Sequence, residues 1–136
     1  MKLTEFEATL STGKKALYSN DEEGDLLEII FRQAEATCAV GLTESIFLHF
    51  DFDTAEPLSL SLIGFSRLIQ PAEYDVQYFR LLVDEWPEEV REKVMSMLRS
   101  APLNEFLQVG GYTPPHTRDV IPLATLKRPQ LLTQAA

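Results

Sequence analysis

The sequence predicts an α+β fold in which an antiparallel β-meander of about four or five strands packs against one or two C-terminal helices. Three observations support this. Across residues 14–69, apolar residues alternate with polar ones, which is the period of a half-buried strand. After Tyr74 the apolar residues recur at helical spacing or give way to loops. The clearest strands are separated by connections of hairpin length.

The strongest strand signal covers residues 45–53, and the next covers residues 58–63. The polar linker between them, residues 54–57, ends in Pro57, which fits the start of a strand and not its interior. Two earlier strands are predicted over residues 26–32 and 15–18. The sheet has a fifth strand if residues 37–42 pair as well. The simplest arrangement is a meander with one buried face.

A helix is predicted over residues 87–99. Pro87 fits the first helical position, and the acidic residues after it suit the positive end of the helix dipole. Residues 72–83 are compatible with either a helix or a strand. From residue 103 onward glycines and prolines predict loops, with an edge strand over residues 119–126 and a frayed end over 131–136.

We expect one domain over residues 1–136, divided into the meander (15–70), a helical part (71–109) and a C-terminal segment rich in proline and glycine (110–136).

The chain carries 21 acidic and 12 basic residues, a net charge of -9. Such a field repels nucleic acid and anionic membranes, so neither is expected as a partner. The N-terminal ten residues do not resemble a secretory signal and no apolar run has the ~20 residues that span a bilayer, so we expect a cytoplasmic protein. The single cysteine, Cys38, excludes an intramolecular disulfide, and no cofactor is expected.

The first half has a layout of its own: Tyr18 and an acidic cluster at 21–25, an apolar run at 26–31, then residues 44–51 and 57–68. This layout, about residues 15–70, resembles the small bacterial domain-of-unknown-function family 2283. The resemblance implies a compact sheet domain and gives no catalytic residues. It also implies a neutralising role, because such members look to be encoded beside small toxin-like proteins. Two departures are that members usually have a glycine where this chain has residues 53–57, and that residues 71–136 have no counterpart.

His49, Asp51 and Asp53 alternate along the strongest strand and would therefore share one face. One imidazole and two carboxylates suit a divalent metal, so these three residues are the candidate metal ligands. The alternative is the solvated face of a sheet, with Asp53 at the start of a turn. The acidic run at residues 21–25 is too short for a calcium loop and predicts a solvated turn.

His116 lies in a loop with two glycines, two adjacent prolines, an arginine and an aspartate. With only two histidines in the chain, His49, Asp51 and His116 are the candidate catalytic residues. The same loop is suited to contact a partner through Tyr112, His116 and Arg118. A loop with no chemistry is the third interpretation.

Small size, acidic charge and the family resemblance favour a non-enzymatic interaction protein that binds a basic protein partner, in the manner of an antitoxin or inhibitor. The first alternative is a self-associating structural module, in which open sheet edges pair in a homodimer. The second alternative is a small metal-dependent enzyme, which the sequence disfavours.

Overall fold

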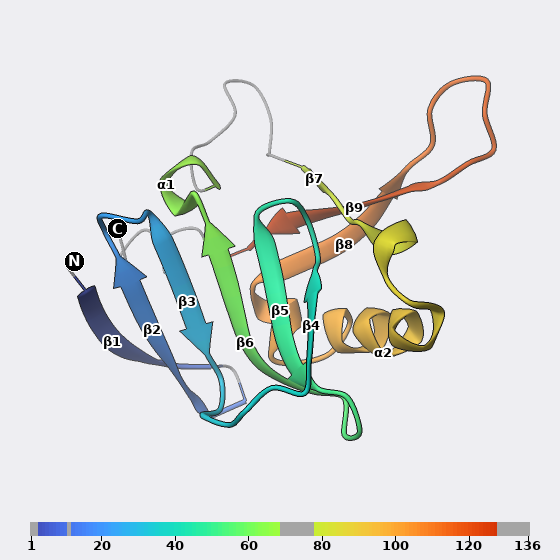
Figure 1. Ribbon diagram of the computed structural model, residues 1–136. Helices are drawn as coiled ribbons and strands as arrows, with labels where there is room; N and C mark the ends of the chain where they lie inside the picture. Colours follow the sequence, from blue (N-terminus) through green and yellow to red (C-terminus); the bar gives the residue numbers. More distant parts are fainter. Residues whose placement is uncertain (1–2, 11, 69–77, 128–136) are drawn as a thin grey trace.

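The computed structural model describes residues 3–10, 12–68 and 78–127 (Figure 1). Most of its first half forms a six-stranded antiparallel sheet, here called the main sheet, in the order β1-β2-β3-β6-β5-β4. Its strands are β1 (Leu3–Thr9), β2 (Lys15–Asp21), β3 (Leu26–Ile30), β4 (Cys38–Gly41), β5 (Ile46–Asp51) and β6 (Glu56–Ile63). Two three-stranded meanders, β1 to β3 and β4 to β6, are therefore joined where β3 pairs with β6.

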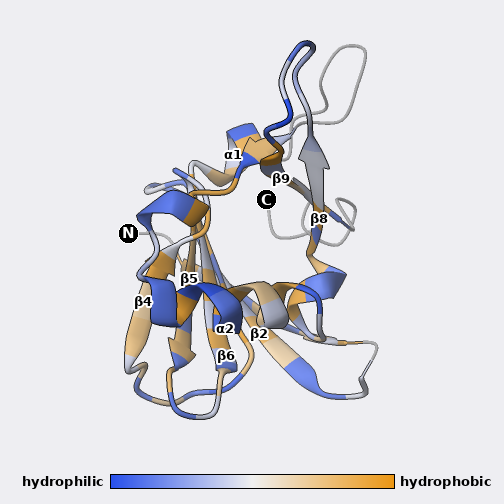
Figure 2. Ribbon diagram, turned by 90° about the vertical axis from the view of Figure 1, so that its right-hand side faces the viewer, coloured by the Kyte–Doolittle hydropathy of each residue, from blue (hydrophilic) through white to orange (hydrophobic). Residues whose placement is uncertain are grey.

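A smaller sheet in the second half has the order β7-β9-β8. It consists of β7 (Phe79–Arg80), β8 (Leu107–Tyr112) and β9 (Ile121–Leu126), all paired antiparallel. The helical elements are α1 (Phe65–Leu68), α2 (Glu88–Leu98) and two 3-10 turns, η1 (Val83–Glu85) and η2 (Leu103–Glu105). Figures 1 and 2 show that α2 and the small sheet lie on one side of the main sheet. That covered side is here called the inner face.

The core forms where the inner face meets α2 and the small sheet. Alternate residues of β5 and β6, such as Leu48 and Leu60, are fully buried there. The helix α2 contributes a buried stripe at helical spacing, and Phe106 packs from the segment before β8 against Tyr18 and Phe31. Period-two and helical patterns thus meet in one hydrophobic cluster, as expected for two layers that bury each other's apolar faces.

Two polar contacts fix the second half to the edge and end of the main sheet. The indole N–H of Trp86, which is 3% exposed, donates to the backbone oxygen of Gly41 at 2.7 Å. The ammonium group of Lys93 donates to the backbone oxygen of Phe52 at 2.6 Å and lies 3.7 Å from the centre of the Phe52 ring. These contacts hold the start of α2 beside β4 and its middle beside the β5–β6 turn.

The α+β class is confirmed. The strands predicted at 15–18, 26–32, 45–53 and 58–63 are present in close outline. The predicted helix is present too, and it starts at Glu88 with Pro87 as its N-cap. The prediction of loops from residue 103 onward is wrong, because β8 spans two glycines and pairs along its whole length with β9. The edge strand predicted at 119–126 is instead the middle strand of the small sheet. Of residues 72–83, those before 78 lie outside the described residues; β7 is a strand and Val83 begins a 3-10 turn. The end at 131–136 also lies outside the described residues.

Candidate functional site

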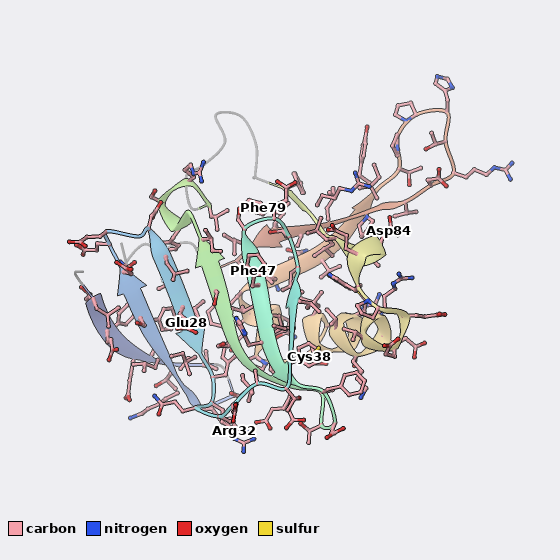
Figure 3. All side chains as sticks on the ribbon, viewed as in Figure 1. Glu28, Arg32, Cys38, Phe47, Phe79 and Asp84 are labelled. Atoms are coloured by element: carbon pink, nitrogen blue, oxygen red, sulfur yellow. The ribbon has the colours of Figure 1, made fainter. Side chains whose placement is uncertain are left out.

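The face of the main sheet opposite α2, here called the outer face, is not covered by any described helix or strand (Figures 1 and 2). The register places its side chains in rows across the strands. One row runs Glu5, Ser19, Glu28, Ser61, Phe47. The next row towards the β5–β6 turn runs Glu7, Leu17, Ile30, Ser59, His49. Figure 3 labels Glu28 and Phe47 of the first row.

This face combines small residues at its centre with larger ones at its flanks. Ser59 and Ser61 of β6 are flanked by Glu28 and Ile30 on one side and by β5 on the other. A cavity of about 390 Å³ lies over Ser59 and is bounded by His49, Glu28 and the segment after β3, including Arg32. Arg32 itself pairs with Glu56 at 2.6 Å. His49 therefore borders a hollow of the outer face whose lining mixes polar residues with apolar ones such as Ile30 and Leu58.

The candidate metal ligands do not converge. His49 and Asp51 lie on β5, which ends at Asp51, so Asp53 is in the turn that follows. One carboxylate oxygen of Asp51 accepts hydrogen bonds from the backbone N–H groups of Asp53 and Thr54, at 3.0 and 3.3 Å. Within the described ranges no group of three His, Cys, Asp or Glu side chains is placed to hold a metal ion. The geometry favours the turn interpretation, with Asp51 in the role predicted for Asp53.

The acidic run at residues 21–25 forms the β2–β3 turn. Asp21 accepts a hydrogen bond from the backbone N–H of Gly24 at 3.1 Å. Asp25 accepts from both the hydroxyl and the backbone N–H of Ser66, at 2.7 and 2.9 Å, which ties this turn to α1. These hydrogen bonds, the hydroxyl first, lower the pKa of the Asp25 carboxyl below its ordinary 3.8. Two of the four carboxylates of the run thus have structural roles in the turn.

The candidate partner-binding residues lie together on the β8–β9 hairpin, which projects away from the main sheet and has a hydrophilic tip (Figures 1 and 2). Tyr112 ends β8 and is 52% exposed, and His116 and Arg118 are exposed in the connecting loop. His116 has a φ of 66°, and the hydroxyl of Thr117 donates to the backbone oxygen of Pro114 at 2.9 Å. The loop is therefore a compact turn that presents its side chains to solvent.

The candidate catalytic residues are not assembled into one site. His49 and Asp51 belong to the outer face of the main sheet, whereas His116 is on the projecting hairpin of the small sheet. Consecutive side chains on one face of β5 give an imidazole beside a carboxylate, but that carboxylate already accepts two backbone hydrogen bonds. The arrangement provides no nucleophile and base within hydrogen-bonding reach among these three residues.

Sequence reasoning missed how unevenly charge is distributed. Residues 3–68 carry twelve acidic and four basic residues, whereas residues 78–127 carry seven and six. The excess negative charge therefore belongs to the main sheet and its turns. Counting charge separately for the strand-patterned and helix-patterned halves would have revealed it, but Glu5 and Glu7 could be placed on the outer face only once β1 was known.

The chain matches no protein-family model, no curated protein and no solved structure at a significant level. The resemblance of residues 15–70 to the domain-of-unknown-function family 2283 therefore stays a prediction. Among the described residues, no helix has the length and apolar character needed to cross a bilayer.

Proposed function

We propose that this protein is a non-enzymatic interaction protein that binds a basic protein partner through the outer face of the main sheet. The observation that carries the proposal is the concentration of carboxylates on and around a sheet face that no described element covers. Glu5, Glu7 and Glu28 stand on that face, and the acidic turn at residues 21–25 borders it.

Apolar side chains on the same face as these carboxylates support a protein partner over a small ion. Leu17, Ile30 and Phe47 are half-buried, and Ile63, at the end of β6, is 47% exposed. Protein interfaces combine an apolar centre that packs with a polar rim that stays hydrated. The carboxylates would attract lysine and arginine side chains at long range, while the apolar residues would hold the docked complex.

Binding of this kind suits an antitoxin or inhibitor, since an acidic face complements the basic surface of a partner protein. The family resemblance points in the same direction. The self-associating module and the metal-dependent enzyme remain the alternatives. Self-association through the outer face would bring like charges together, which disfavours it.

The experiment is native mass spectrometry of the tagged protein, purified from its source cells at low ionic strength. We expect a stoichiometric complex with a protein of high isoelectric point. Raising the salt from about 0.05 M to about 0.5 M should dissociate the complex, because exposed charge pairs are screened. A bare monomer, a homodimer, or a partner that is acidic and insensitive to salt would contradict the proposal.

A further inference from the structure

A second surface lies on the opposite side of the molecule, where β8 is an edge strand of the small sheet and, among the described residues, pairs with β9 alone. A cleft of about 630 Å³ runs between α2 and one face of β8; it is here called the β8 cleft. A second cavity, of about 390 Å³, lies over the other face of β8 and is bounded by Tyr78 and Leu123. Both share Gln108, Val109, Gly110 and Gly111 of β8. The edge of β8 thus has a hollow on each of its faces.

The charge of the β8 cleft is opposite to that of the protein as a whole. Arg91, Arg99 and Lys127 line it, and among the described residues that bound either hollow there is no aspartate or glutamate. Within the described part of the chain none of the three cations pairs with a carboxylate. The side chain of Arg91 donates a hydrogen bond to the backbone oxygen of Trp86, and that of Lys127 donates one to the backbone oxygen of Asn104. The Nε–H of Arg91 is buried without an acceptor.

The edge of β8 also lacks the features that keep sheet edges from pairing. Its sequence, Leu-Gln-Val-Gly-Gly-Tyr, has neither a charge nor a proline. By comparison, the β1 edge carries Glu5 and Glu7. The β4 edge is capped at its end, where Leu82 donates its backbone N–H to Leu42 at 2.9 Å and Trp86 binds Gly41. Gly110 leaves open space beside β8, because a Cβ added there would meet no atom within 4 Å.

We infer that β8 binds an extended acidic peptide segment of a partner protein, which adds to the small sheet as a fourth strand. Side chains of an added strand alternate between the two faces of the sheet, and each face of β8 has a hollow to receive them. Side chains on the α2 side would meet Arg91, Arg99 and Lys127, so acidic residues are preferred at alternate positions. The peptide backbone would supply the affinity, and the cations would supply the preference for acidic sequences.

Charge complementarity favours this occupant over a second copy of the chain. Pairing β8 with β8 across a two-fold axis would place two sets of the same three cations close together, which is unfavourable. This site is independent of the basic partner proposed for the outer face. One protein could therefore hold a basic partner on one side and an acidic segment on the other.

The test uses the full chain and a fluorescein-labelled peptide of about six alternating glutamate and valine residues, a length that matches the 6 residues of β8. Binding is followed by fluorescence anisotropy. Arg99→Glu is the main variant, because Arg99 is exposed and lines the β8 cleft, and its hydrogen bond to Asn104 within the described part of the chain uses its backbone oxygen. Lys14→Glu, the same reversal from a positive to a negative side chain, on the exposed turn between β1 and β2 and outside both hollows, is the matched control. A peptide with every second amide N-methylated tests whether backbone hydrogen bonds are needed.

We expect Arg99→Glu to weaken binding about tenfold, Lys14→Glu to change it less than about twofold, and N-methylation to abolish it. Hydrogen exchange should slow at the amides of β8 when the peptide is added, and not at those of β1. Equal losses in the two variants, or equal binding of the methylated peptide, would reduce the effect to non-specific attraction and overturn the inference. No binding of the peptide, or a concentration-dependent dimer that protects β8 by itself, would overturn it as well.

Discussion

Replacing Trp86 with phenylalanine tests how the second half is attached to the main sheet. The substitution keeps an aromatic ring in the buried site but removes the N–H that donates to Gly41 at 2.7 Å. A hydrogen bond of this kind contributes about 0.5–1.5 kcal/mol, and a buried acceptor left without a partner adds to the loss. Together with the smaller ring, we expect a loss of about 1–2.5 kcal/mol in the free energy of unfolding.

The expected loss corresponds to a measurable fall in melting temperature. An unfolding entropy of about 2.1 cal/mol/K per residue, over 136 residues, is roughly 0.29 kcal/mol/K. The melting temperature of Trp86→Phe should therefore fall by about 3–9 °C. Circular dichroism is the assay, since Trp86 is the only tryptophan and the variant has no indole fluorescence. Phe47→Leu is the control: Phe47 is a half-buried residue of the outer face, and its replacement should lower the free energy of unfolding by less than about 1 kcal/mol. If Trp86→Phe has the same melting temperature as the wild type, the indole does not hold the second half to β4.

Three further predictions concern the turn at residue 25 and the core. Because the folded-state pKa of Asp25 is lowered, its contribution to stability is present above the ordinary value of 3.8 and is lost as pH falls through the lower folded-state value. The difference in melting temperature between wild type and Ser66→Ala should then be largest near neutral pH and shrink below about pH 4; a difference that does not vary with pH would contradict this. Leu60→Ala, at a site 1% exposed, should lower the free energy of unfolding measured in urea by about 2–5 kcal/mol. Ile63→Ala, at a site 47% exposed, should lower it by less than about 1 kcal/mol. Similar losses in the two variants would mean that the two faces of β6 are misassigned. Gly64→Ala should lose about 1 kcal/mol by the same method, because φ is +69° there, and an unchanged midpoint would show that this conformation is not needed.

The sequence predicted those elements whose signal is local. The strand that became β5 was clear because Ile46, Leu48 and Phe50 alternate with more polar residues, and one face is buried against α2. The helix was clear because Val90 and Val94 recur at helical spacing after Pro87. In both cases the pattern along the chain is the pattern of burial.

The missed elements depend on partners distant in sequence. Gly110 and Gly111 have low strand propensity, and only pairing with β9 makes them part of β8. The joining of β3 to β6 brings Glu28 opposite Ser61, which hairpin connections alone do not indicate. The same limit applies to the sites: alternation placed His49 and Asp51 on one face correctly, but the charge of the β8 cleft arises from α2, β8 and Lys127 meeting in space.

The central claim, that the outer face binds a basic partner, is tested most directly by one comparison of native mass spectra. Glu5→Lys/Glu28→Lys changes two carboxylates that flank Ser19 on the outer face, and Glu88→Lys/Glu92→Lys makes the same charge change on the exposed side of α2. Each variant is purified from the source cells and the fraction in complex is measured. We predict that the outer-face variant loses the complex and that the α2 variant keeps it. Equal retention, or loss only in the α2 variant, would contradict the claim.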